Sequence, residues 1–169
     1  MAKKIATRGA QRPLVAEFTF SFNDWVIDSA DGVKKTFGST VALSADPTES
    51  GLTGPVANTI TFDALPLPYG AVVVGGEIIN EVAFVGPTAC TLKVGIAGTL
   101  EAYLGAAAGL LLAAAKTRVP LVLTDAMASS AGQNVRLTMA YTVANATAGK
   151  VRVRIMYTID GRADENTIN

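Results

Sequence analysis

Strict alternation of apolar and polar residues is the feature that most constrains this chain. From Val151 to Ile159 the odd positions are all apolar or aromatic, while Arg152 and Arg154 stand at even positions. The run from Val135 to Val143 alternates in the same way. A period of two is typical of a β-strand with one buried and one wet face. The residues between the two runs, 144–150, favour turns, so we predict a hairpin that joins them.

Other segments carry the same strand signal. Phe18, Phe20 and Phe22 alternate with polar residues, which predicts a shared core-facing side, and a change of phase near Asn23 predicts a bend. The long apolar stretch from Ala71 to Val85 is interrupted by a pair of glycines and predicts a kinked strand. About seven or eight strands with regularly spaced turn signals indicate a mostly β protein, an antiparallel sandwich or barrel.

The stretch from Ala102 to Ala115 has a different character. It contains no charged residue and is rich in alanine and leucine. Glu101 precedes it and Lys116 follows it, so each end carries the charge that favours a helix terminus. We therefore predict one short helix within a loop. The run is too short to span a membrane, which needs about twenty apolar residues.

The 169 residues indicate one domain. We divide the chain into a basic N-terminal arm (1–13), a single β-sandwich domain (14–165) and a C-terminal tail (166–169). The arm owes its charge to Lys3, Lys4, Arg8 and Arg12.

The overall charge argues against two classes of partner. Lysine plus arginine number 14, as do aspartate plus glutamate, so there is no net positive field to attract nucleic acid or an anionic membrane. Arg152 and Arg154 lack interleaved aromatics on their face, which favours exposed or interface arginines over a nucleic-acid site. Half of the residues are hydrophobic and only 17% are charged, which predicts apolar surface that meets other protein subunits.

Catalytic chemistry has little support in the sequence. The chain contains no histidine, which excludes Ser–His and Cys–His dyads and removes the commonest zinc ligand. No glycine-rich phosphate loop of the known types occurs. A glycosidase would need a pair of carboxylates, and the candidates are Asp125, Asp160, Asp164 and Glu165. Their spacing does not single out an acid and a base. We predict that the chain is not an enzyme and has no cofactor.

Two smaller motifs have simple structural interpretations. Asp28 and Asp31 could offer oxygen ligands to a metal, but Asp-Gly at this position is more typical of a turn. Cys90 is the single cysteine and lies in an apolar, strand-like stretch, which predicts a buried thiol. No secretory signal is visible, so we expect synthesis and assembly in a reducing cytoplasm.

Two segments resemble small structural proteins of tailed-bacteriophage heads. One is the C-terminal run from Gly149 to Glu165, and the other is the run from Leu92 to Leu104, in which Ile96 stands where those proteins carry an acid. The similarity extends over roughly Thr59 to Glu165. It implies a jelly roll or related sandwich that decorates the outside of a capsid as a cement protein.

The resemblance also implies partners and a location. The partners would be the major capsid protein and further copies of the chain, in a homodimer or homotrimer. The protein would be made in the cytoplasm of the host bacterium and end on the capsid exterior of the virion. The candidate contacts with the capsid or a neighbouring subunit are the four basic arm residues, Lys3, Lys4, Arg8 and Arg12.

Other functions remain open from the sequence. The first alternative is another virion role, such as a head-fibre base, a head-completion subunit or a tail component, because one fold serves many functions. The second is a carbohydrate-binding module, for which Trp25 and four tyrosines are available as aromatic platforms. The last alternative is a carboxylate-dependent glycosidase.

Overall fold

The computed structural model describes residues 13–37, 59–123, 133–142 and 145–159. Within these ranges the chain forms ten β-strands and no helix. The strands are β1 (Leu14–Ser21), β2 (Trp25–Ile27), β3 (Lys34–Thr36), β4 (Thr59–Pro66), β5 (Ala71–Val85), β6 (Ala89–Ile96), β7 (Thr99–Leu104), β8 (Thr117–Pro120), β9 (Asn134–Thr142) and β10 (Ala148–Ile159). The described part of the chain contains no helix that could cross a membrane.

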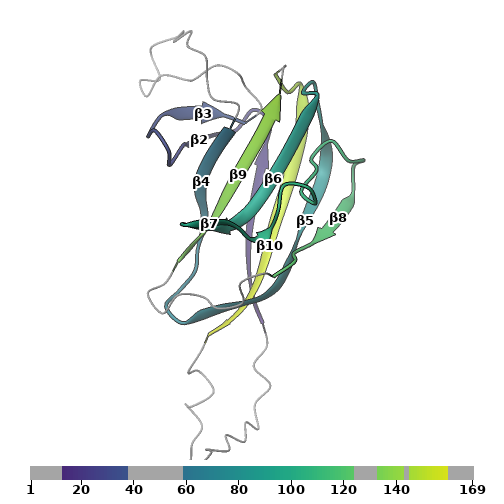
Figure 1. Ribbon diagram of the computed structural model, residues 1–169. Helices are drawn as coiled ribbons and strands as arrows, with labels where there is room; N and C mark the ends of the chain where they lie inside the picture. The colour runs from purple at the N-terminus through teal and green to yellow at the C-terminus, as the bar shows by residue number, and fades with distance from the viewer. Residues whose placement is uncertain (1–12, 38–58, 124–132, 143–144, 160–169) are drawn as a thin grey trace, which may run out of the picture.

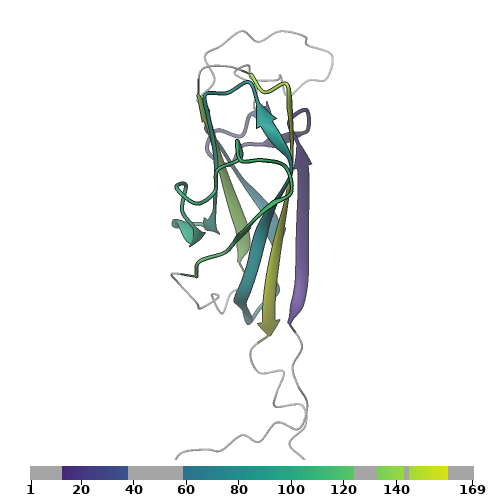
Figure 2. The same ribbon diagram turned by 90° about the vertical axis from the view of Figure 1, so that its right-hand side faces the viewer.

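The strands form two antiparallel sheets that face each other and a separate hairpin (Figures 1 and 2). One sheet has the order β1-β10-β5-β8, the other has the order β4-β9-β6-β7, and β2 pairs only with β3. With the β2–β3 hairpin set aside, most chain neighbours lie in opposite sheets, and the strand order is that of a jelly roll. The predicted mostly β, antiparallel sandwich is therefore confirmed.

The core fills the space between the two sheets. From the first sheet, Val151, Val153 and Ile155 of β10 point inward and have no exposed surface. From the second sheet, Leu137 and Met139 of β9 are equally buried. These are the apolar positions of the two alternating runs, so the period of two correctly predicts which face of each strand is buried.

A cluster of phenylalanines occupies one part of this core. Phe20 lies with its ring centroid 4.2 Å from that of Phe37 and 6.2 Å from that of Phe62. Phe18 and Phe22 are partly buried and pack against the same cluster. The shared core-facing side predicted for β1 is confirmed. Since Phe37 directly follows β3, the cluster also holds the β2–β3 hairpin against the sandwich.

The connection between β9 and β10 differs from the prediction. We expected a hairpin over residues 144–150, but β10 pairs with β1 and β5, and β9 pairs with β4 and β6. The chain crosses from one sheet to the other between the two strands. Alternation shows that each strand has a buried face, and it gives no information about which sheet each strand joins.

The helix predicted over Ala102–Ala115 is wrong. Ala102 to Leu104 belong to β7, which pairs with β6, and the residues after them form turns. Leu92 N–H donates to Gly109 C=O (2.7 Å), and Leu111 N–H donates to Cys90 C=O (2.9 Å). These bonds to β6 replace the internal bonds that a helix would make. Leu111 is buried in the core, which further stabilises the extended path.

The same segment closes one side of the sandwich. Leu111 C=O accepts a hydrogen bond from Phe84 N–H of β5 (2.9 Å), so the segment contacts a strand of each sheet. The buried Asn80 side chain donates from Nδ2 to the carbonyls of Leu111 (3.2 Å) and Ala113 (2.6 Å). The apolar, uncharged composition that suggested a helix therefore reflects a covering segment over the core.

Candidate interaction surfaces

The basic residues predicted to contact a capsid or subunit, Lys3, Lys4, Arg8 and Arg12, lie outside the described residues. The structure does show where the arm joins the sandwich. Leu14 at the start of β1 pairs with Tyr157 near the end of β10. The described chain therefore begins and ends at one end of the sandwich (Figure 1).

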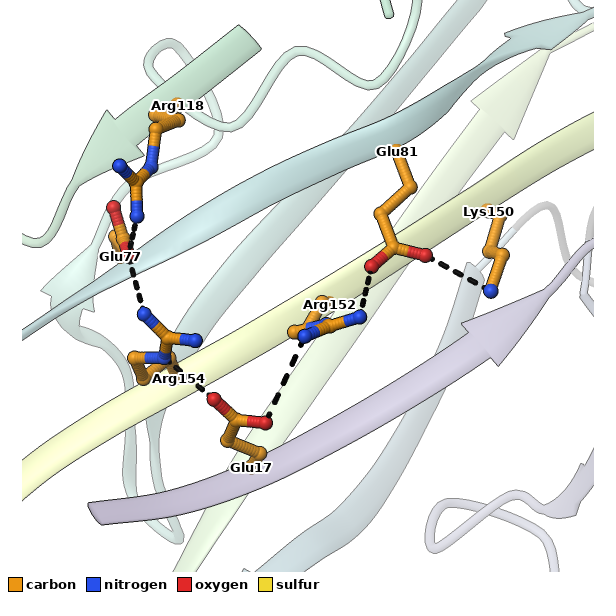
Figure 3. Close-up of polar contacts among 7 residues, drawn as sticks. All are labelled: Glu17, Glu77, Glu81, Arg118, Lys150, Arg152 and Arg154. Atoms are coloured by element: carbon orange, nitrogen blue, oxygen red, sulfur yellow. Dashed lines mark hydrogen bonds and ion pairs between the residues drawn. The ribbon is translucent and has the colours of Figure 1, made fainter. Parts of the chain in front are cut away.

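The outer face of the first sheet carries a charge ladder across all four of its strands (Figure 3). Opposite charges alternate along it in the order Arg118, Glu77, Arg154, Glu17, Arg152, Glu81 and Lys150. The Glu77 carboxylate lies 2.6 Å from Arg118 and 3.1 Å from Arg154. Arg154 Nε also donates to Glu17 Oε1 at 2.6 Å. The ladder joins strands that are far apart in the sequence.

Two members of the charge ladder have shifted pKa values. The hydrogen bond from Lys150 lowers the pKa of Glu81, and it outweighs the opposing effect of burial. The hydrogen bond to Glu17 raises the pKa of Arg154. Both shifts favour the charged forms. Arg152 and Arg154, predicted to be exposed or interface arginines, are therefore partly buried members of a paired network.

The outer face of the second sheet is also polar. Arg136 of β9 donates from Nε to Asp63 Oδ1 of β4 (2.7 Å) and from Nη2 to Oδ2 (3.2 Å). The hydrogen bond from Arg136 lowers the pKa of Asp63. A shallow hollow of about 380 Å³ lies on this face, and its lining residues are Ser29, Ala30, Thr61, Gly98, Leu100 and Arg136. Because the Arg136 guanidinium already binds Asp63, the hollow presents no unpaired guanidinium to a ligand.

A buried ion pair fixes the base of the β2–β3 hairpin. Lys35 Nζ donates to Asp28 Oδ2 at 2.7 Å, and the two side chains are 4% and 2% exposed. Asp28 Oδ1 also accepts backbone N–H bonds from Ala30 (2.9 Å) and from Thr61 of β4 (3.3 Å). Ser29 N–H donates to Thr61 C=O at 2.6 Å. These contacts attach the hairpin to the edge of the second sheet.

The same cluster contains Asp28 and Asp31, the two carboxylates that could offer oxygen ligands to a metal. Lys35 Nζ lies 2.6 Å from Asp31 Oδ2 as well as close to Asp28, so an ammonium group occupies the position between the two carboxylates. The hydrogen bond from Lys35 lowers the pKa of Asp31. Burial opposes the charge of Lys35, yet the hydrogen bonds that its ammonium group donates to Asp28 and Asp31, with the attraction between the opposite charges, outweigh burial and raise the pKa of Lys35. Across the described ranges, no cluster of potential metal ligands occurs.

The candidate residues for other chemistry are placed differently. Cys90 is fully buried, and desolvation raises the pKa of its thiol to about 12, so the predicted buried thiol is confirmed. The four carboxylates considered for a glycosidase, Asp125, Asp160, Asp164 and Glu165, lie outside the described residues.

Several large apolar side chains are exposed on the described surface. On the β2–β3 hairpin, Trp25 is 55% exposed and Ile27 is 49% exposed. Others lie elsewhere on the sandwich: Leu14, Val15, Tyr69, Val74, Val82, Val85, Leu110, Leu112 and Val122. The sequence indicates a bend near Asn23 and offers Trp25 as an aromatic platform for sugars. It does not show that β2 pairs with β3, because β3 is only three residues long.

The comparisons with known proteins bear on the fold. No protein-family model matches the chain, and no curated protein matches it. Among solved structures, it is similar to a chain of the structure described as "Cyanophage Pam1 capsid asymmetric unit". The TM-score is 0.54, the sequence identity is 20%, and the match covers 94% of each chain. The two chains share a fold. Since the match covers the same share of both, they also have similar lengths.

Proposed function

We propose that this protein is a structural component of a bacteriophage virion that binds the outside of the capsid as a homo-oligomer. It would stabilise the contacts between major capsid subunits, as a decoration or cement protein does. The observation that carries the proposal is the fold shared, over nearly the whole chain, with a chain of a cyanophage capsid. The resemblance of the segments within Thr59–Glu165 to phage head proteins supports the same assignment.

The physical properties of the sandwich suit this role. Its two sheets are joined by a continuous core, and ion pairs link neighbouring strands on both outer faces, which favours a rigid sandwich. Rigid binding surfaces lose little entropy when they dock. In a dimer or trimer, one docked copy holds the others at high effective concentration, so modest contacts combine into strong attachment.

The basic arm supplies a second contact in this proposal. Lys3, Lys4, Arg8 and Arg12 would dock on the capsid or on a neighbouring subunit by charge complementarity. The test compares full-length protein with a variant that lacks residues 1–12. Lower occupancy on capsids is the expected result, and equal occupancy would remove the arm from the proposal.

Binding to undecorated capsids tests the main proposal. Purified protein is mixed with capsids that lack it, and cryo-electron microscopy counts and locates the bound copies. Many copies on the outer shell at seams between capsomers are expected, together with a dimer or trimer in solution by light scattering. A monomer that fails to bind capsids would contradict the proposal.

Other virion roles predict a different result in the same images. A head-fibre base, a head-completion subunit or a tail component would appear in few copies at one vertex or on the tail. Such an image would retain the virion assignment and reject decoration of the shell. That the chain is not an enzyme stays a prediction.

A further inference from the structure

The outer face of the β2–β3 hairpin combines exposed apolar groups with a cation. Trp25 and Ile27 alternate with the inward-facing Val26 and point away from the sandwich. Lys34 pairs with Ile27 across the hairpin, and its Nζ lies 3.9 Å from the centroid of the Trp25 ring. We call Trp25, Ile27 and Lys34 the hairpin face. The chain contains no other tryptophan.

The hairpin is held firmly from below. Lys35 is inward-facing and bonded to Asp28, and Phe37 is inserted into the aromatic core. Phe37 N–H donates to Asp24 C=O at 3.0 Å, which closes the open end of the hairpin. A buried ion pair and a buried ring at the base keep the hairpin face in one orientation. The exposure of Trp25 is therefore a property of the folded sandwich.

The chemistry of the hairpin face indicates its partner. A tryptophan on a rigid support is the residue type most enriched among those that dominate binding energy at protein interfaces. Lys34 has no carboxylate partner among the described residues. Its ammonium group contacts the face of the Trp25 ring. Two apolar side chains, Trp25 and Ile27, beside the positive charge of Lys34 would complement an apolar depression that has a carboxylate at its rim.

A protein partner fits this face better than a sugar does. Carbohydrate platforms present a ring face together with polar side chains that bond the hydroxyls. Here the ammonium of Lys34 lies over the ring of Trp25, and the neighbour on the same strand is the aliphatic Ile27.

We propose that the hairpin face is the anchor through which this protein binds the capsid shell, by inserting Trp25 and Ile27 into an apolar depression bordered by a carboxylate. This inference rests on the proposed function. The β2–β3 hairpin and the two ends of the described chain lie at opposite ends of the sandwich (Figure 1). The eight residues of β1 separate them by about 26 Å. Contacts through the hairpin and through the basic arm can therefore be removed independently.

Substitutions on the hairpin face test the proposal by capsid binding. We expect Trp25→Ala and Ile27→Ser each to weaken binding to undecorated capsids about tenfold or more. Tyr69→Ala is the matched control, because Tyr69 is an aromatic residue at 73% exposure on another part of the surface. We expect Lys34→Glu to weaken binding, whereas Lys116→Glu, at an exposed lysine elsewhere on the sandwich, leaves it unchanged. Urea unfolding of each variant checks that the sandwich remains folded.

The accessibility of Trp25 provides a second measurement. Acrylamide quenching of the free protein reports on this residue alone, because there is one tryptophan. Strong quenching is expected, and a protected tryptophan would overturn the proposal by showing that the face is already covered. Hydroxyl-radical footprinting should then show protection of Trp25 when capsids are bound.

The outcomes separate this inference from the proposed function. If the unaltered protein binds capsids and Trp25→Ala binds equally well, the hairpin anchor is wrong and the capsid role stands. If the unaltered protein does not bind capsids, the proposed function fails and the anchor fails with it. If Trp25→Ala retains capsid binding but loses binding to a glycan array, the face is a sugar site and the proposal is overturned.

Discussion

At the scale of single residues, Lys35 stands out among the described residues because it is a buried lysine. Its ammonium group is removed from water and bonded to the buried Asp28 carboxylate. Removing one partner of such a pair leaves an uncompensated buried charge, which typically costs about 3 to 5 kcal/mol. The stability of the hairpin base therefore depends on both residues being present.

We predict that Lys35→Met lowers the free energy of unfolding by about 3 to 5 kcal/mol. The double variant Asp28→Asn/Lys35→Met should recover a large part of this loss, because it removes both charges. Urea denaturation of the single and double variants measures the coupling. Lys93→Met is the control, since the side chains of the Lys93–Glu101 pair are 30% and 53% exposed, far more than those of Lys35 and Asp28. Equal losses in the Lys35 and Lys93 variants would contradict the prediction.

Glu81 predicts a dependence of stability on pH. Its pKa is lowered from the ordinary value of 4.5, chiefly by the hydrogen bond from Lys150. A depressed pKa in the folded state stabilises the protein above the unfolded value, and this contribution is lost as the pH falls through the folded pKa. The stability advantage of the unaltered protein over Glu81→Gln should therefore shrink below about pH 4.5.

Unfolding free energies measured in urea at a series of pH values test this dependence. The other carboxylates with lowered pKa values, Asp31 and Asp63, are present in both proteins and cancel in the difference. A difference between Glu81→Gln and the unaltered protein that stays constant from neutral to acidic pH would show that the Glu81 bonds contribute nothing.

At the scale of elements, the close packing of the segment after β7 against β6 requires a glycine at position 109. A Cβ added at Gly109 would overlap with the carbonyl oxygen of Leu92, a backbone atom of the paired strand β6. We predict that Gly109→Ala lowers the free energy of unfolding by about 2 kcal/mol or more. Gly105→Ala is the matched control, because there the added Cβ meets the flexible end of Glu101 at 3.3 Å. Equal unfolding midpoints in urea for the two variants would contradict this account.

The elements also show how far the sequence predicts the fold. Alternation correctly located β9, β10 and the long β5, because each has one face in the core. It failed on the connection between β9 and β10, since the choice of sheet depends on contacts between distant strands. Composition, which predicted a helix over Ala102–Ala115, failed there because a segment that covers a core needs apolar, uncharged residues whether it is helical or extended.

The interaction surfaces were less predictable than the strands. Arg152 and Arg154 were visible on the wet face of β10, but their partners Glu17, Glu77 and Glu81 follow only from the strand register. No local signal shows that Lys35 is buried while the adjacent Lys34 lies on the surface. That difference arises from the orientation of the hairpin on the edge of the second sheet.

At the scale of the whole molecule, the two ends of the described chain are neighbours. We predict that a circular permutant, with residue 159 joined to residue 14 by a short linker and the chain opened between Tyr69 and Gly70, keeps the fold. The paired residues Leu14 and Tyr157 lie on adjacent strands, and the opened turn is exposed. A cooperative urea transition and an unchanged circular dichroism spectrum are expected. The control is the same opening without the linker, as two co-expressed fragments, which should be less stable.

Because both ends of the described chain lie at the same end of the sandwich, their position matters for the design of fusion proteins. Both ends of the described chain lie at the end of the sandwich away from the β2–β3 hairpin (Figure 1). If the hairpin grips the shell, cargo joined after residue 159 begins at the end of the sandwich opposite the attachment point. Cargo joined ahead of residue 13 would begin beside the basic arm and would interfere with the contact proposed for that arm, so the C-terminal side is the better place for a fusion.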